Sequence, residues 1–297
     1  MPFKTVHAWN LIWSTIKQAD LILEILDARN PNGTRSAQIE DFVKKEPNHY
    51  LILVLNKIDL VPRDVGRAWQ EILKKEFPTI AINARHPGDV TTFIVFMKNI
   101  LKQHPFWKDQ DKTFTVLVVG YPNSGKSTLI QSLTRNKKKV GISPLAGFTK
   151  VIQKIKLEEK LYVLDSPGII PVEKYDEEVY QALDTGSIRP QLVADKESVI
   201  DEIFRRVGVE GLNKIYGIEA SDEADFIEQL GKTRGLLAKG GIVKENEVFE
   251  ILIRDWQRSF IAFYYAPNPA NITSKGIPHA GRPMHATLRE PESTDKN

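Results

Sequence analysis

The segment GYPNSGKST at residues 120–128 combines glycines, a lysine and hydroxyl residues at a spacing that suits one kind of chemistry. Gly120 is followed by four residues and then by Gly125 and Lys126, between an apolar run and a helical pattern, which is the context of a phosphate-binding loop. An ordinary glycine turn into a surface helix is the competing interpretation. In a phosphate loop, backbone NH groups curl around the β-phosphate at a helix N-terminus. Those NH groups would belong to Asn123, Ser124, Gly125, Lys126, Ser127 and Thr128.

Side chains of the same loop and of the segment after it are suited to a triphosphate with Mg²⁺. Lys126 would reach the β- and γ-phosphates, and the Ser127 hydroxyl would ligate Mg²⁺. Further on, PLAGFTK at residues 144–150 supplies Thr149 as a second Mg²⁺ ligand on a switch loop. A plain surface loop would have a similar composition, so this interpretation depends on the neighbouring motifs.

The segment DSPG at residues 165–168 ends another apolar run. The Asp165 carboxylate could hold Mg²⁺ through water, and the Gly168 NH could meet the γ-phosphate. These four residue types are also common in turns, so the position of the segment after the phosphate loop makes the functional interpretation the stronger one.

The segment NKID has the chemistry to distinguish guanine from adenine. The Asp59 carboxylate can accept two hydrogen bonds from the ring NH and amino group of guanine, while the stem of Lys57 covers the ring. Adenine offers no such pair of donors. A second short segment, NAR, could meet the base carbonyl through backbone NH groups, although both segments also resemble turns. The expected base contacts are Asn56, Lys57, Ile58, Asp59, Asn83, Ala84 and Arg85.

Apolar runs alternate with helical patterns over the first part of the chain. This alternation predicts an α/β fold with a mostly parallel six-stranded sheet covered on both faces, with one antiparallel pair at an edge. After it, only helical patterns occur. We expect a nucleotide domain over residues 1–172, an all-helical domain over 173–267 and a disordered, proline-rich tail over 268–297. The six strands are expected at residues 21–28, 51–56, 79–83, 115–120, 151–157 and 161–165.

Composition excludes several protein classes. The 297 residues are 41 % hydrophobic, which suffices for a packed core. There is no cysteine, so disulfide scaffolds and thiolate metal sites are excluded. No apolar run approaches the roughly 20 residues of a membrane span, and no leader pattern is seen, so a cytoplasmic location is expected. A net charge of +3 permits contact with nucleic acid without demanding it.

The motifs resemble the five nucleotide motifs of a GTPase in the order four, five, one, two, three. Together with DARNP at residues 27–31 and GTRS at 33–36, they resemble the circularly permuted GTPases of the YlqF/YawG ribosome-assembly type. The resemblance continues through LDTGSIRP, GKTRGLLAKGG and VFEILIRDWQRS, and GTRS and WQRS are similar to the nucleolar GTP-binding branch. It implies a GTPase that converts GTP to GDP with Mg²⁺ and assists maturation of the large ribosomal subunit.

Many GTPases place a glutamine after the switch glycine to orient the attacking water, but this chain has Ile169 there. We therefore expect slow intrinsic hydrolysis, stimulated by ribosomal particles. The resemblance implies two substitutes, an activating K⁺ held by Asn123 and an N-terminal histidine. The family histidine would fall near Lys4, and His7 lies about one helical turn later, so a core or surface role for His7 competes with a catalytic one.

Binding to ribosomal RNA would need cationic side chains, although each of them could equally belong to a solvated surface. We expect a monomer in which the helical domain contacts RNA, without a DNA or membrane partner, and a nucleolar location if the source is eukaryotic. The alternatives are a regulatory switch acting on a protein partner and a protein acting on tRNA. The candidate RNA contacts are Arg135, Lys137, Lys138, Lys139, Arg189, Lys232, Arg234 and Lys239.

Overall fold

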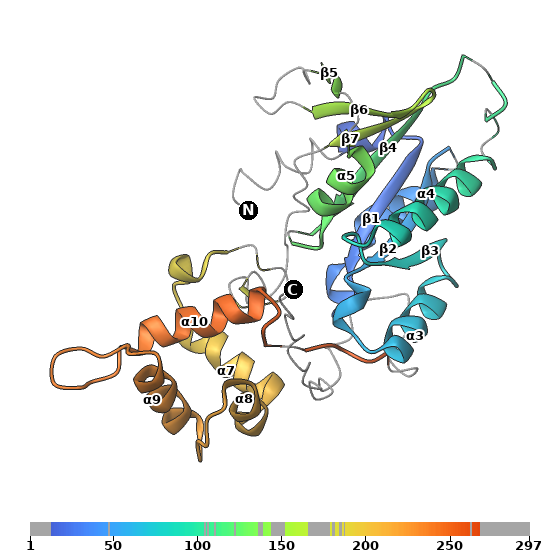
Figure 1. The fold of residues 1–297 in the computed structure, drawn as a ribbon. Helices are drawn as coiled ribbons and strands as arrows, with labels where there is room; N and C mark the ends of the chain where they lie inside the picture. Colours follow the sequence, from blue (N-terminus) through green and yellow to red (C-terminus); the bar gives the residue numbers. More distant parts are fainter. Residues whose placement is uncertain are drawn as a thin grey trace, which may run out of the picture. The chain divides into compact units, whose positions relative to one another are not determined.

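The computed structural model divides the chain into two compact units, Met1–Glu173 and Lys174–Asn297, each described here by itself (Figure 1). The sequence placed this division after residue 172. Of residues 139–143, 152, 153 and 165 only the backbone is described. The structure describes residues 13–46, 48–103, 105, 107–109, 111–121, 123–135, 139–143, 152–165, 179, 182–183, 186, 188–261 and 263–267.

The first unit is built on a twisted sheet with the strand order β3-β2-β1-β4-β7-β6-β5. Strands β1, β2, β3, β4 and β7 run parallel, whereas β6 is antiparallel to both β7 and β5. The expected antiparallel pair at one edge is therefore present. The strands are β1 (Leu21–Asp27), β2 (Tyr50–Asn56), β3 (Thr79–Ile82), β4 (Phe114–Gly120), β5 (Lys139–Ser143), β6 (Ile152–Glu158) and β7 (Leu161–Asp165).

All six expected strands exist, but the sheet has seven strands rather than six within the part of the chain that the structure describes. The additional strand, β5, has the sequence KVGIS and lies at the edge, where it pairs with β6 across a register shift. A basic run leads into it and a glycine interrupts it, so its pattern lacks the apolar continuity of the central strands. Edge strands are often short and charged, because these features discourage pairing of the exposed edge with another chain.

Helices cover both faces of the sheet, as the apolar character of the strands predicts. All seven residues of β1 are buried. On one face Leu21, Leu23 and Ile25 share a core with α4 and α5, while buried residues of α2 and α3 lie outside that core. The helical segments of this unit are η1 (Asn32–Thr34), α2 (Ala37–Lys45), η2 (Ile58–Leu60), α3 (Arg63–Leu73), α4 (Pro87–Leu101) and α5 (Lys126–Thr134).

The second unit is helical and has its own core. Trp256 of α10 is fully buried, stacks on Phe263 at 4.1 Å between ring centroids, and donates to the carbonyl of Leu183 at 2.7 Å. Within the described residues, no helix is long and apolar enough to cross a membrane. The helical segments of the second unit are η4 (Pro190–Leu192), α7 (Lys196–Val207), α8 (Val209–Tyr216), α9 (Glu223–Thr233) and α10 (Glu245–Gln257).

Candidate nucleotide-binding site

The candidate site lies at the carboxyl ends of the parallel strands. Strands β1, β2, β3, β4 and β7 all point their carboxyl ends to the same side of the sheet, so the segments that follow β1, β2, β3 and β4 meet there (Figure 1). The chain visits β1, β2 and β3 before β4, yet β1 and β4 are hydrogen-bonded neighbours. The permuted order of the motifs is therefore compatible with one assembled site.

Asn56, at the end of β2, joins three of these loops. Its side-chain amide donates to the carbonyl of Ser124 in the phosphate loop at 2.9 Å. Its side-chain oxygen accepts from the backbone NH of Ala84, in the NAR segment after β3, at 3.0 Å. Asn56 is only 3 % exposed, so both hydrogen bonds are shielded from water. The predicted base-reading and phosphate-binding segments are thus physically linked.

Glycine is required at two points of the phosphate loop. Gly125 has a φ of +102°, and a Cβ there would lie 2.0 Å from the side-chain nitrogen of Asn56. Gly120 has a φ of +147°, and a Cβ there would lie 2.6 Å from the carbonyl oxygen of Ile25 in β1. The first glycine allows the Asn56 bridge to close, and the second allows β4 to approach β1.

Lys126 opens α5 and carries its charge into a poorly solvated position. Its ammonium donates to the carbonyl of Tyr121. Burial, together with the nearby charge of Lys57, lowers the pKa of Lys126 to about 7. A phosphate group at this position would relieve both effects, because an anion favours the charged lysine.

Asp27, the last residue of β1, pairs with two cations, Lys57 of the base-reading segment and Arg29 of the segment that follows β1. Its Oδ2 atom accepts from Lys57 Nζ at 2.8 Å and from Arg29 Nη2 at 2.7 Å, and its Oδ1 accepts from Arg29 Nε at 2.9 Å. Although burial alone would raise the pKa of the Asp27 carboxyl, Arg29 and Lys57 hold that pKa well below its usual range. Lys57 itself adopts a left-handed backbone conformation with a φ of 63°.

The role of Asp27 escaped the sequence-based assignment of the site. Thirty positions separate Asp27 from Lys57 along the chain, as the sequence separation of their hydrogen bond shows. The only indication of Asp27 in the sequence was the DARNP segment, which was used for the family resemblance alone. A polar residue at the end of a buried, largely apolar strand beside the phosphate-loop strand is the physical feature that would have found it.

The expected base contacts lie around this bridge. Ile58 and Asp59 are in η2, and Asp59 is exposed, as a residue that receives a ligand must be. In the NAR segment, Asn83 accepts from the backbone NH of Arg85 at 2.9 Å. Ser132 of α5 donates to the carbonyl of Ala84 at 2.7 Å, which attaches this segment to the helix that follows the phosphate loop.

The residues expected to hold Mg²⁺ are described only in part. Ser127 is exposed at the second position of α5, and Asp165 ends β7, the neighbour of β4 in the sheet. Thr149, Gly168 and His7 lie outside the described residues. No cluster of three acidic or histidine ligands is found within the described part of the chain. This donor set fits Mg²⁺, which keeps several waters and binds through one or two protein groups and the phosphates.

Asn123 and the candidate RNA contacts remain predictions. Asn123 is exposed with a φ of 58°, a conformation that asparagine tolerates in turns. Among the basic residues, Lys137 and Lys138 lie outside the described residues, and Lys139 is described only by its backbone, at the start of β5. Lys232 is ion-paired with Glu228 at 2.5 Å. The exposed members of the set are Arg135, Arg189, Lys232, Arg234 and Lys239.

Comparisons with known proteins agree with this geometry. A family model described as "50S ribosome-binding GTPase" matches residues 115–214. Nucleolar GTP-binding protein 2 of Pneumocystis carinii is 36 % identical over 273 residues, covering 89 % of this chain and 55 % of that protein. Nuclear/nucleolar GTPase 2 of Oryza sativa subsp. japonica is 35 % identical over 290 residues, covering 97 % of this chain and 53 % of that protein. The chain spans about half the length of the curated relatives it matches.

Solved structures show the same permuted arrangement. The GDP-bound structure of YlqF matches with a TM-score of 0.61 at 24 % identity, covering 87 % of this chain and 99 % of that one. The structure of GNP-bound YlqF from T. maritima matches with a TM-score of 0.61 at 25 % identity, covering 86 % and 95 %. The chain therefore has the circularly permuted GTPase fold of YlqF, and over most of its length it is homologous to nucleolar GTP-binding protein 2. The predicted fold class and resemblance are thereby confirmed.

Gly125→Ala tests the linked loops of this permuted GTPase. The added Cβ would collide with the Asn56 amide and strain a positive φ, so the hydrogen bond to Ser124 should break. We expect guanine-nucleotide affinity to fall roughly tenfold or more, as for loss of a buried hydrogen bond with added strain. Titration with a fluorescent GDP derivative measures this. Gly217→Ala, with a φ of +67° and nothing within 4 Å of the added Cβ, is the strain-matched control; equal affinity for all three proteins would refute the bridge.

Asp27→Asn tests the charge arrangement behind the base reader. The variant leaves the half-buried Lys57 and the buried Arg29 without their carboxylate, and breaking such a buried pair costs about 3 kcal/mol. We expect the β1 and β2 amides to lose hydrogen-exchange protection and GDP affinity to fall. The exposed Asp64→Asn, in the first turn of α3, should leave both unchanged. Unaltered protection in Asp27→Asn would contradict the role assigned to Asp27.

Proposed function

We propose that this protein binds and hydrolyses GTP and assists assembly of the large ribosomal subunit. The observation that carries the proposal is the Asn56 bridge, because it holds the base-reading segment against the phosphate loop at 2.9 Å. A guanine held by Asp59 and phosphates held by Lys126 are then parts of one ligand. The family description and the names of the relatives support the ribosomal part.

In this proposal Lys126 and the NH groups of the phosphate loop hold the phosphates, while Ser127, with Thr149 and Asp165, holds Mg²⁺. The ion would neutralise charge that develops on the phosphates. Because Ile169 replaces the usual glutamine, intrinsic hydrolysis is slow. The exposed Asn123 is the proposed holder of an activating K⁺, and bound ribosomal particles complete the catalytic arrangement.

The proposed coupling to RNA follows from chain order. Only nine positions separate Asp165, at the end of β7, from Lys174, where the helical unit begins. Nucleotide-dependent rearrangement after β7 would therefore act directly on the unit that we propose contacts ribosomal RNA. The GTP state would bind the particle tightly and the GDP state would be released.

The proposed location is the nucleolus, in a eukaryotic source. The relatives are named nucleolar or nuclear GTP-binding proteins. The sequence-based expectation of a cytoplasmic location rested on the lack of a leader or an apolar span, features that do not distinguish cytoplasm from nucleus. The comparisons give that expectation no support.

Asp59→Asn tests the base reader. Asparagine cannot accept both guanine hydrogen bonds but can donate one to the additional carbonyl of xanthine. We expect GTP affinity to fall at least tenfold, as for hydrogen bonds to a charged group, and affinity for xanthosine triphosphate to rise. Competition against a fluorescent GDP derivative measures both. If GTP affinity is retained and the xanthine nucleotide gains nothing, Asp59 does not read the base.

GTP turnover measured with and without large-subunit particles, in K⁺ and in Na⁺, tests the whole proposal. We expect the highest rate with particles in K⁺ and slow turnover of the protein alone. Asn123→Ala should remove the difference between K⁺ and Na⁺ without abolishing nucleotide binding. Equal rates in all four conditions would contradict both the ribosomal and the potassium roles, and stimulation by a protein partner or by tRNA instead would indicate a different switch.

A further inference from the structure

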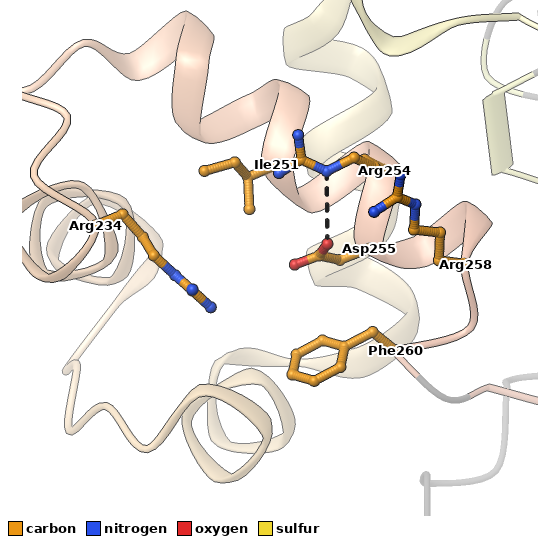
Figure 2. Close-up of a pocket in the computed structure, with 6 residues that line it drawn as sticks. All are labelled: Arg234, Ile251, Arg254, Asp255, Arg258 and Phe260. Carbon is orange, nitrogen blue, oxygen red and sulfur yellow. Dashed lines mark ion pairs between the residues drawn. The ribbon is translucent and has the colours of Figure 1, made fainter.

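The helical unit contains a cavity of about 420 Å³ next to the carboxyl end of α10 (Figure 2). This volume falls within the usual range for small-ligand pockets and is large enough for a group of nucleotide size. All of its lining residues belong to the second unit, and none of them is part of a GTPase motif. The lining residues are Arg234, Ile251, Arg254, Asp255, Arg258 and Phe260.

Three guanidinium groups give this cavity a positive character. Arg254 lies in the last turn of α10, Arg258 directly follows that helix, and Arg234 extends toward the cavity from the end of α9 (Figure 2). Asp255 is the only acidic group of the lining. Its carboxylate already accepts from the Tyr216 hydroxyl at 3.0 Å and lies 3.9 Å from Arg254 Nε. The cavity therefore retains a net positive charge that suits a phosphate, which guanidinium groups bind with paired hydrogen bonds.

An exposed aromatic ring stands beside these charges. Phe260 is 53 % exposed, although its other contacts hold it in a defined orientation. Tyr216 packs against it edge to face, with ring centroids 5.5 Å apart. The left-handed Ser259, with a φ of 64°, turns the chain so that the Phe260 NH donates to the carbonyl of Asp255 at 2.9 Å. The ring is thus fixed before any ligand arrives, which lowers the entropic cost of stacking a planar group on it.

We infer that this cavity binds one nucleotide of a single-stranded RNA, with the phosphate between the arginines and the base stacked on Phe260. The inference rests on the proposed ribosomal function and extends it by naming the RNA-contacting residues. Stacking on aromatic rings beside cationic groups is the usual way in which proteins hold unpaired RNA. An acidic peptide could pair with the arginines, but it would leave the exposed ring unused, so RNA is the better match.

The segment between α9 and α10 begins at one of the residues that line the cavity. Arg234 begins it, and Leu237 pairs with Val243 in an antiparallel bridge that closes a small hairpin. At its tip Gly240 and Gly241 have positive φ values and open space where a Cβ would be. The exposed Lys239 precedes them. A backbone so accessible lets neighbouring phosphates approach closely, so the RNA strand can continue from the cavity onto the hairpin.

Anisotropy of a fluorescently labelled single-stranded RNA of about twelve nucleotides, titrated with the full chain at several salt concentrations, tests this inference. Phe260→Leu should weaken binding roughly tenfold without changing the salt dependence, because it removes stacking alone. Arg258→Gln should weaken binding and reduce the slope of log affinity against log salt by about 0.7, the value for one phosphate contact on a single strand. Phe260→Tyr should retain wild-type affinity.

Arg205→Gln is the matched control, since Arg205 is an exposed arginine of the same unit, paired with Glu202 and absent from the cavity lining. The inference is overturned if Phe260→Leu and Arg258→Gln behave like this control, if the wild-type chain does not bind the RNA, or if polyglutamate displaces the RNA from wild type and Phe260→Leu equally well.

GDP affinity measured in parallel should be unchanged in every variant. A chain that binds RNA through the cavity but does not bind GDP would refute the proposed GTPase function and leave this inference standing.

Discussion

The candidate site depends on one side-chain amide. Asn56 must donate to Ser124 in the phosphate loop and accept from Ala84 after β3 at the same time. Aspartate could accept but not donate, and a hydrophobic residue could do neither. Because the amide is buried, losing either bond would leave a backbone group unsatisfied away from water, at a cost of about 1–3 kcal/mol. The positive φ of Gly125 follows from the same constraint, since only glycine leaves room for the amide.

Around this bridge, the buried charges of the described residues are balanced unequally. Lys57 and Lys126 both lie in poorly solvated positions and repel each other. Asp27 compensates Lys57, whereas burial together with Lys57 lowers the pKa of Lys126 to about 7, with no carboxylate of the described side chains opposing the shift. Binding energy is then available to an anion at the phosphate loop, because the anion would restore the charged form of Lys126. Relief of this charge repulsion would thus contribute to the affinity for a phosphate.

The sequence predicted those parts of the site whose chemistry is local. GYPNSGKST, NKID and the six apolar strands were recognisable because backbone NH groups at a helix start, a carboxylate at a strand end and continuous burial each leave a pattern within ten residues. The contacts of Asp27 with Lys57 and of Asn56 with Ser124 join residues 30 and 68 positions apart, and no local pattern reports such pairs. Strand β5 escaped because a glycine and a charge obscure its periodicity.

Permutation leaves the loops of the site unchanged and alters only what is attached to them. Eight residues lie between Asp165 and Lys174, and they span at most about 30 Å when fully extended, so a rearrangement at the end of β7 would occur close to the start of the helical unit. If GTP favours an arrangement of the helical unit in which the Arg258 and Phe260 cavity binds RNA more tightly, RNA must raise the affinity for GTP by the same factor. A particle that offers the right unpaired nucleotide would then select the GTP-bound protein. Hydrolysis would remove that preference, so the slow intrinsic rate that we propose would be an advantage: the complex would persist until the particle completed the catalytic site.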